Sequence, residues 1–343
     1  MRGKRAELIA KGGRGELALL ERIRRQADRP ASGELRLGIG DDCALLRLRS
    51  GEEMAVTTDL SIAGRHFRLE WHPPEAVGHR ALARGLSDIA AMGARPVAAF
   101  LSIGLPRELT MARGRRPAWI DGFLAGFLAL AQAHQTPLAG GDLAESPVAV
   151  ADIVLLGAVP RSNALLRSGA RPGDLLYVTG TLGGAAAGFA QLRKRKTRVA
   201  RVPVYIPQAN DPLAPHLWPQ PRIAQGLWLR RHQAATAAID LSDGLSTDLT
   251  HLCAESGVSA MINAAALPLH PGATLQQALH GGEDYELLFT ARPRAAIPRR
   301  IAGLAVTQIG IIEPRRGGKP PVVLIDESGL RRPLLPGGWQ HFS

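Results

Sequence analysis

Six short acidic motifs, each placed beside Gly, Ser or Thr, constrain the fold of this chain more than any other feature of its sequence. Several follow apolar stretches typical of buried strands, such as residues 54–56 before Thr57 and residues 237–239 before Asp240. Folding therefore draws carboxylates inward, where an unpaired anion is strongly unfavourable. The motifs are Gly-Asp-Asp at 40–42, Thr-Thr-Asp at 57–59, Ser-Asp at 87–88, Gly-Gly-Asp at 140–142, Asp-Leu-Ser-Asp-Gly at 240–244 and Gly-Gly-Glu-Asp-Tyr-Glu at 281–286.

The pattern favours divalent cations that carry phosphate as the partners of these acids. Mg²⁺ prefers carboxylate and hydroxyl oxygens, and proteins usually share it with the phosphates of a substrate. We therefore expect an enzyme that acts on a metal–nucleotide complex.

The length of 343 residues favours two domains over a single core. We expect a mixed α/β (α+β) fold with domains at 1–160 and 161–343. The two cysteines, Cys43 and Cys253, are too few for a disulfide framework and fit a reducing cytoplasm. No apolar secretory core follows the first residues, and no stretch sustains the roughly 18 apolar residues of a membrane span. We therefore expect neither export nor membrane insertion.

The net charge of +12 raises the alternative of a basic nucleic-acid-binding protein. However, the basic residues are spread along the chain, with one dense run at 193–201, and aromatic residues are scarce. No nucleic-acid-binding module is evident. We expect no nucleic-acid partner and interpret the charge as a mild attraction for anionic ligands.

The first domain is predicted to alternate strands and helices. Residues 1–30 resemble a charged helix, and prolines and glycines delimit a second helix at about 74–92. A third helix is predicted at 119–134, before a glycine turn at 140–142. Strands are expected at 35–39, 54–58, 97–105 and 148–159.

The second domain begins again with a strand, a glycine turn and an Ala-rich helix after residue 172. The turn lacks the ending of a P-loop, so the glycines at 180, 183 and 184 favour close helix packing over a phosphate cradle. Residues 193–222 are Arg-rich and then Pro-rich, which predicts an irregular surface insertion with little core. Strands are expected before Asp240 and at 287–289, with a helix that ends near Gly257.

Each acid also has an ordinary structural interpretation as a turn or helix-capping residue. Asp59 is predicted to end a strand, and Asp88 lies inside a helix, where Asp is a poor residue unless it has a partner. Small residues such as Gly85 share the face of Asp88 and leave room for a ligand. Alternation would place Glu283 and Tyr285 on one face of an extended segment.

The sequence contains no spacing typical of a covalent nucleophile, and no general base is expected. His66 follows Asp59 in a glycine-containing loop, where a purely structural role is an equal alternative. A phosphate ester as acceptor explains the absence of a base, because it is already largely dianionic at neutral pH.

In their joint order, these motifs resemble the thiamine-monophosphate kinases, a family of the aminoimidazole-ribonucleotide-synthetase-like ATP-binding superfamily. The resemblance covers nearly the whole chain. It rests on the segments 38–44, 57–59, 63–67, 86–93, 140–142, 167–170, 177–181, 239–245, 281–286 and 339–342.

The resemblance implies ATP-dependent phosphorylation of thiamine monophosphate to thiamine diphosphate by direct transfer, with several Mg²⁺ ions. It also implies a homodimer joined through the N-terminal domains. By motif, the implied metal ligands are Asp41, Thr57, Thr58, Asp59, Asp88, Asp142, Asp240 and Asp243. The implied ATP contacts are Gly141, Arg167 and Ser242, and the implied acceptor contacts are His66, Glu283 and Trp339.

The chain departs from the family pattern where Gly85 replaces an Asn, where Leu143 replaces a Thr, and where 216–219 reads His-Leu-Trp-Pro without an Arg. These positions concern secondary nucleotide or metal contacts. The alternative within the superfamily is another ATP-dependent enzyme, such as a ring-closing synthetase or a selenophosphate synthetase. The reactive Cys or Lys of the latter is not evident near the N-terminus.

Overall fold

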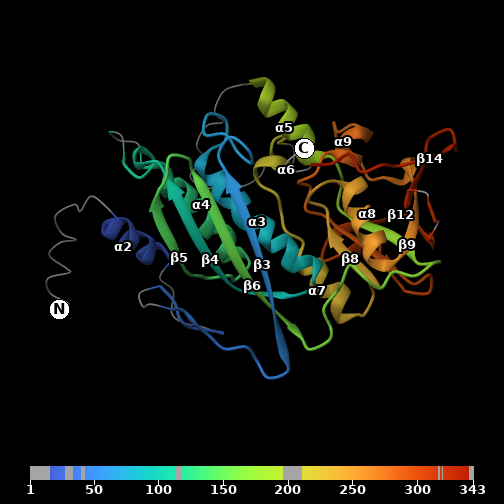
Figure 1. The fold of residues 1–343 in the computed structure, drawn as a ribbon, viewed down its shortest axis with the longest axis horizontal. Coiled ribbons are helices and arrows are strands. Elements are labelled where there is room, and N and C mark those ends of the chain that lie inside the picture. Colours follow the sequence, from blue (N-terminus) through green and yellow to red (C-terminus); the bar gives the residue numbers. More distant parts are fainter. Residues whose placement is uncertain are drawn as a thin grey trace.

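A computed structural model describes residues 16–27, 34–39, 43–112, 114, 117–195, 211–315, 317–318 and 320–339. The fold is a mixed α/β arrangement in two parts, each with its own sheet and helices (Figure 1). Helix α3 (Pro74–Ala91) lies between the two sheets and contacts both parts.

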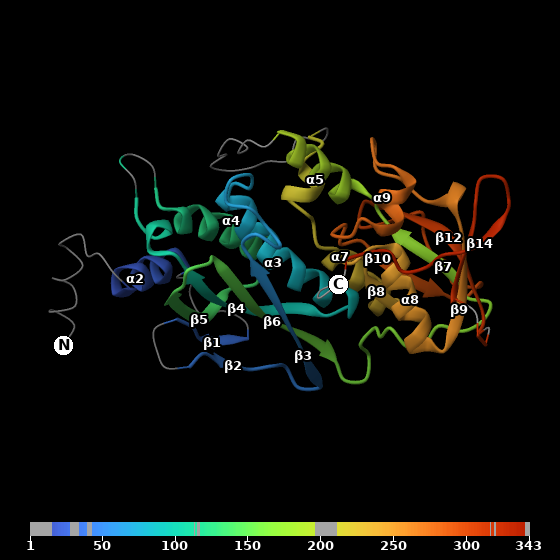
Figure 2. The same cartoon turned by 45° about the horizontal axis from the view of Figure 1, so that its top comes forward.

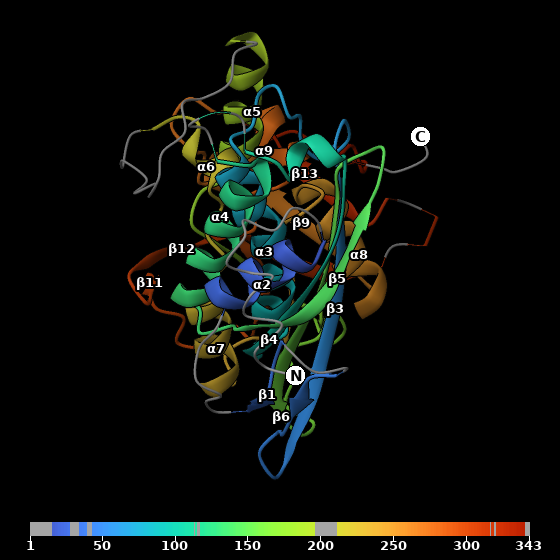
Figure 3. The same cartoon turned by 90° about the vertical axis from the view of Figure 1, so that its left-hand side faces the viewer.

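The N-terminal part is built on a four-stranded sheet in the order β3 (Glu52–Ile62), β6 (Val150–Pro160), β4 (Arg95–Leu105) and β5 (Leu138–Glu145). Helix α3 and helix α4 (Trp119–Ala133) cover one face, and α2 (Glu16–Ala27) lies on the same side of the sheet in contact with α4 (Figure 3). The short strands β1 (Leu35–Leu37) and β2 (Leu45–Leu46) lie beside the sheet (Figure 2). The predicted helices at 74–92 and 119–134 and the predicted strand at 97–105 are confirmed to within two residues.

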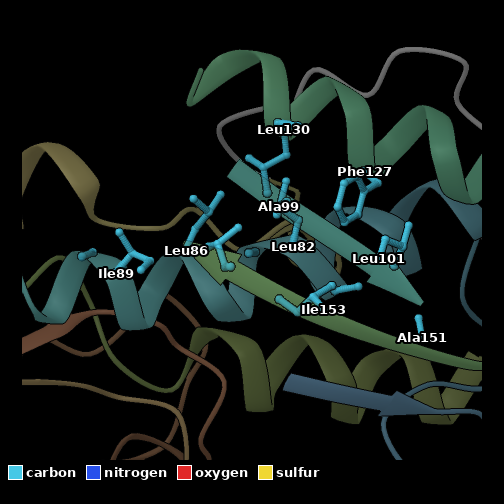
Figure 4. Packing of buried hydrophobic residues seen from close by; sticks show 14 of the residues in the cluster. Leu82, Leu86, Ile89, Ala99, Leu101, Phe127, Leu130, Ala151 and Ile153 are labelled. Carbon is cyan, nitrogen blue, oxygen red and sulfur yellow. The ribbon is translucent and has the colours of Figure 1, made fainter. Parts of the chain in front are cut away.

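The core of this part forms where α3 and α4 pack on the sheet (Figure 4). Leu82 and Leu86 of α3 and Phe127 of α4 belong to one hydrophobic cluster, and all three side chains are fully buried. The two helices approach so closely that a Cβ added at Gly126 would lie 1.8 Å from the carbonyl oxygen of Glu75. Glycine at this contact therefore fixes how near α4 lies to α3.

The C-terminal part is built on a second, larger sheet. Its main strand order is β14 (Arg331–Pro333), β13 (Val322–Ile325), β9 (Val258–Asn263), β12 (Leu304–Pro314), β7 (Leu175–Thr179), β10 (Leu287–Ala291) and β8 (Ala237–Asp240), and β11 (Arg300–Ile301) pairs with β12. The helices of this part are α5 (Gly184–Arg195), α6 (Ala214–Leu217), α7 (Ile223–Arg231), α8 (Leu245–Ser256) and α9 (Leu275–His280), with a 3-10 turn at Ala264–Ala266. A further 3-10 turn, Arg107–Leu109, follows β4 in the N-terminal part. The expected strands before Asp240 and at 287–289, and the helix that ends at Gly257, are confirmed.

Three local predictions are wrong. Residues 140–142 form no turn, because they lie inside β5 and pair in parallel with β4. Asp59 does not end a strand, since β3 continues to Ile62. The insertion predicted at 193–222 has a real core in its last part, where Leu213, Leu217 and Trp218 are buried; residues 196–210 lie outside the described residues.

The glycines after β7 serve close packing, as the sequence favours. The amides of Gly183 and Ala185 donate hydrogen bonds to the Asp284 carboxylate at 2.6 and 3.1 Å. These two amides already donate to the Asp284 carboxylate, and a phosphate cradle would need them as its own hydrogen-bond donors. None of the helices in the described ranges combines the length and apolarity needed to cross a membrane.

Candidate active site

One face of α3 carries three charged residues at successive intervals of four, Arg80, Arg84 and Asp88. Residues at this spacing lie one above the other on a helix. Each of the three meets a different acidic or hydroxyl group from elsewhere in the chain. The candidate site is built along this face.

Asp59 and Asp88 lie on the N-terminal side of the site. The Arg84 guanidinium donates from Nε to Asp59 Oδ2 at 2.9 Å and lies 2.7 Å from Oδ1 through its second nitrogen. The Thr57 hydroxyl donates to Asp88 Oδ2 at 2.5 Å. Thr57 and Asp59 share the face of β3 that looks towards α3, because strand residues two apart point the same way.

Asp240 lies on the C-terminal side, at the end of β8. It is 2% exposed, and its Oδ2 accepts a hydrogen bond from the Ser87 hydroxyl at 2.7 Å. The Ser-Asp motif at 87–88 therefore faces both parts of the chain. Ser87 contacts the second part, while Asp88 contacts β3 of the first.

The carboxylates of this cluster interact electrostatically. Burial raises the pKa of Asp59 to about 6, although Arg84 opposes the rise, and the nearby charge of Asp88 adds to it. Burial and the charge of Asp88 raise the pKa of Asp240 to about 7. Burial also raises the pKa of Asp88, and the Arg167 guanidinium opposes the rise at both Asp88 and Asp240, so it lies near the cluster. Such a set of buried acids favours a bound cation.

Asp243 and Asp248 extend the cluster along the turn into α8. The Asp248 carboxylate accepts hydrogen bonds from the amides of Asp243 and Gly244, both at 3.0 Å, and so serves the helix-capping role expected of one acid in this segment. Burial, together with Asp240 and Asp243, raises the pKa of Asp248 to about 8.

The predicted acceptor residues Glu283 and His66 meet at Arg80. One Arg80 nitrogen lies 2.6 Å from Glu283 Oε1 and also donates to the His66 carbonyl oxygen at 3.5 Å. His216 Nδ1 lies 3.4 Å from the other Glu283 oxygen. Burial raises the pKa of Glu283, but Arg80, His216 and Arg84 outweigh it and hold the pKa well below its ordinary value.

A small pocket opens beside this group. It is lined by Ser61, His66, Phe67, Val77, Arg80 and Arg84. The His66 ring also has a structural role, because its Nδ1 accepts a hydrogen bond from the Ile62 amide at 3.1 Å. The pocket lies next to the carboxylate cluster, since Arg84 borders both.

Ser242 and Trp339 lie at the far end of the cluster. The Ser242 carbonyl oxygen accepts the amide hydrogen of Glu283 at 2.7 Å, and the Asp243 carbonyl oxygen accepts that of Trp339 at 3.2 Å. The Trp339 side chain is 51% exposed. The tail thus carries an accessible indole beside the acidic turn.

The chain places the remaining predicted residues differently. Strand alternation turns Thr58 and Asp142 to the sheet face opposite α3, away from Thr57 and Asp59. Gly141 packs against β4, where an added Cβ would lie 1.9 Å from the Leu101 carbonyl oxygen. Asp41 lies outside the described residues.

Two expectations about the backbone are corrected here. Glu283 and Tyr285 have φ of 58° and 51°, so residues 281–286 are not extended and alternation does not apply. Gly85 leaves no room beside Asp88, because an added Cβ would lie 2.6 Å from Ile153 Cδ1 of β6. This departure from the family pattern allows α3 to pack closely on the sheet.

Sequence reasoning missed Arg80, Arg84 and His216. The available signal was the spacing of Arg80, Arg84 and Asp88 on a helix already predicted. Their partners Glu283 and Asp59 are distant in sequence, so the pairing itself was not visible. Trp218, the other departure in this segment, is buried and packs edge-on against the His79 ring.

Comparisons with known proteins agree along most of the chain. Residues 40–159 match the model of the AIR synthase related protein N-terminal domain, and residues 171–322 match the C-terminal domain. A thiamine-monophosphate kinase from Salmonella typhimurium is 38% identical over 87% of this chain and 88% of its own.

Solved structures give the same result. The crystal structure of thiamine-monophosphate kinase from Stenotrophomonas maltophilia has a TM-score of 0.73 and 36% identity, covering 90% of this chain and 96% of the other. The structure of AaThiL complexed with AMPPCP and TMP has a TM-score of 0.71 and 30% identity, covering 96% and 97%.

Proposed function

We propose that this chain, which belongs to the thiamine-monophosphate kinase family, transfers the γ-phosphoryl group of ATP to thiamine monophosphate and forms thiamine diphosphate. One observation supports this most directly. A single face of α3 joins a carboxylate cluster, suited to a metal-bound nucleotide, to a pocket lined by two guanidinium groups, one of which pairs with the Glu283 carboxylate.

Each part of the site suits one part of this reaction. The acceptor phosphate supplies its own nucleophilic oxygen, so the protein has to position it and neutralise charge. Glu283, fixed by Arg80 and His216, offers a carboxylate to the aminopyrimidine, and the Trp339 indole offers a face to the cationic thiazolium. Ser242 and Arg167 are proposed to contact ATP, together with Gly141.

Direct transfer is tested with ATP labelled in its γ-phosphoryl group. We expect the label in thiamine diphosphate and no labelled protein after denaturation and intact mass measurement. A stoichiometric phosphoryl adduct on the chain would contradict direct transfer, and label that remained in ATP would contradict the kinase function.

We propose Mg²⁺ as the metal, held by the described acids Asp59, Asp88, Asp240 and Asp243 with Thr57. Within the described ranges, no three His, Cys, Asp or Glu side chains converge as a complete metal site. One or two carboxylates commonly hold Mg²⁺ together with substrate phosphates. When bound, Mg²⁺ would neutralise phosphate charge. Thr58 and Asp142, on the opposite face of the sheet, and Asp41 stay proposed ligands of other Mg²⁺ ions.

Metal removal is expected to make stability depend on pH. The pKa values of about 7 for Asp240 and about 8 for Asp248 exceed the ordinary value, so between about pH 6.5 and 8 these two groups hold more protons in the folded protein than in the unfolded chain. Stability of the metal-free protein should therefore fall as pH rises to about 8. Burial lowers the pKa values of His72, His79 and His216, so these histidines bind protons only in the unfolded chain, and their opposing contribution fades as pH rises above their ordinary pKa of 6.5.

The check is the thermal unfolding midpoint against pH, with a chelator and with excess Mg²⁺. Mg²⁺ should flatten the dependence, because it stabilises the deprotonated carboxylates. Asp240→Asn should reduce the slope in the chelator. Equal slopes with and without Mg²⁺ would contradict a metal site at these acids.

Replacing Trp339 by Ala should weaken acceptor binding several-fold and leave ATP affinity nearly unchanged. A cation over an indole face contributes roughly 0.5 to 2 kcal/mol. Titration of both ligands measures this, with Leu335→Ala, an exposed residue of the same tail, as the control. Equal weakening of both ligands would instead favour a structural role for Trp339.

We also propose a homodimer joined through the N-terminal sheets. The face of β3 opposite α3 exposes Met54, Val56 and Leu60, which are 45%, 57% and 44% exposed. An apolar strip of this kind is typical of an interaction surface. Light scattering should give twice the mass of one chain.

A cytoplasmic location, proposed from the unpaired Cys43 and Cys253, is testable by fractionation.

A further inference from the structure

Arg84 occupies the position between the acceptor pocket and the carboxylate cluster. Along α3, it lies one turn after Arg80, which holds Glu283, and one turn before Asp88, which binds Thr57. At 1.5 Å per residue, each step of four residues is about 6 Å along the helix axis. Arg84 thus lies where a phosphate between the acceptor pocket and the carboxylate cluster would be found.

The two arginines of the pocket differ in their anionic partners. Arg80 pairs with Glu283, which is proposed to contact the acceptor substrate. We propose that this ion pair persists when the acceptor binds. Arg84 pairs with Asp59 in a two-pronged contact, and its side chain is 17% exposed. Asp59 is itself proposed to take a cation, which would compete with Arg84 for the same oxygens.

A cation bound to Asp59 would therefore deprive the largely buried Arg84 guanidinium of its carboxylate partner. Another anion would then have to pair with Arg84. A buried charge that loses its partner is strongly unfavourable. The pocket beside Arg84 is where the acceptor is proposed to bind, and its phosphate is largely dianionic at neutral pH. Guanidinium and phosphate match through paired hydrogen bonds.

We propose that Arg84 binds the phosphate group of the acceptor and sets the preference for the phosphorylated form of thiamine. This inference rests on the proposed function. Arg84 is suited to the role because α3 is a rigid support. Gly78 and Gly85 of this helix abut Phe123 of α4 and Ile153 of β6, so its backbone has little freedom to shift.

The test compares the affinities for thiamine monophosphate and thiamine by calorimetry, with Mg²⁺ and a non-hydrolysable ATP analogue present. Arg84→Gln should weaken thiamine monophosphate binding about tenfold or more and change thiamine binding by less than about twofold, because the lost contact is a charge-assisted one to phosphate. Arg84→Lys should give an intermediate loss, since it keeps the charge without the planar fork.

Arg95→Gln is the matched control. Arg95 is another partly buried arginine of the N-terminal part, paired with Glu34 and Glu52 away from the site. The Arg95→Gln protein should bind thiamine monophosphate and thiamine with the affinities of the unaltered protein.

Two results would overturn the proposal for Arg84. One is an Arg84→Gln protein that keeps its affinity for thiamine monophosphate, and the other is an equal loss for both ligands. If the unaltered protein bound neither ligand, the proposed function itself would fail, and this inference would fail with it. Should Arg84→Gln not fold, the Arg84→Lys protein decides through the same ratio.

Discussion

Asp59→Asn is expected to lower turnover roughly a thousandfold while the protein still folds, because a preorganised charge at a phosphoryl-transfer site has an effect of this order. Asn keeps the shape of the side chain and removes its charge. Asp59 lies between Arg84 and the charge of Asp88, at the centre of the cluster. Burial raises its pKa to about 6, so the folded protein disfavours the ionised form when no cation is bound.

The measurement is kcat with thiamine monophosphate at saturating ATP and Mg²⁺, beside the thermal unfolding midpoint. Glu52→Gln is the control, since Glu52 lies in the same strand and pairs with Arg95 away from the site. Turnover near that of the unaltered protein would remove Asp59 from the metal ligands. A collapsed unfolding midpoint would instead assign it a structural role.

Gly126→Ala is expected to destabilise the protein by roughly 3 kcal/mol, in the range of a severe overpacking change. In an exposed helix the same substitution stabilises by about 1 kcal/mol. Here the new Cβ would lie 1.8 Å from the Glu75 carbonyl oxygen, a backbone atom that no side-chain rotation can move. The two helices would have to separate, which would disturb the α3 face that carries the site.

Chemical denaturation gives the free energy of unfolding for this comparison. Ala125→Gly is the matched control, because the neighbouring Ala125 is exposed and its loss should cost about 1 kcal/mol from helix propensity alone. A Gly126→Ala protein as stable as the unaltered one would show that α3 and α4 can move apart without lowering the free energy of unfolding.

Strongly patterned elements were predictable from the sequence. Helix α3 begins at Pro74 and ends before Gly93, and its apolar residues Leu82, Leu86 and Ile89 all face the core. The need of Asp88 for a partner was also predictable, because Asp is a poor residue inside a helix. The Thr57 hydroxyl provides that partner.

Other features depend on contacts that no local pattern reveals. The glycines at 140–142 have low strand propensity, yet parallel pairing with β4 makes them a strand. Trp218 belongs to a Pro-rich segment but is buried under α3, against His79. Arg84 looked like an ordinary charged helix residue until β3 placed Asp59 beside it. In each case, tertiary structure decides what local sequence leaves open.

The most direct test of the kinase function is ATP consumption with thiamine monophosphate compared with unphosphorylated thiamine, each with Mg²⁺ and purified protein. We expect thiamine monophosphate to support turnover and to yield thiamine diphosphate in equal amount to the ADP formed. Thiamine should support almost none, because it lacks the phosphate that acts as nucleophile. Equal or faster ATP consumption with thiamine, or none with either, would contradict the function proposed for this chain.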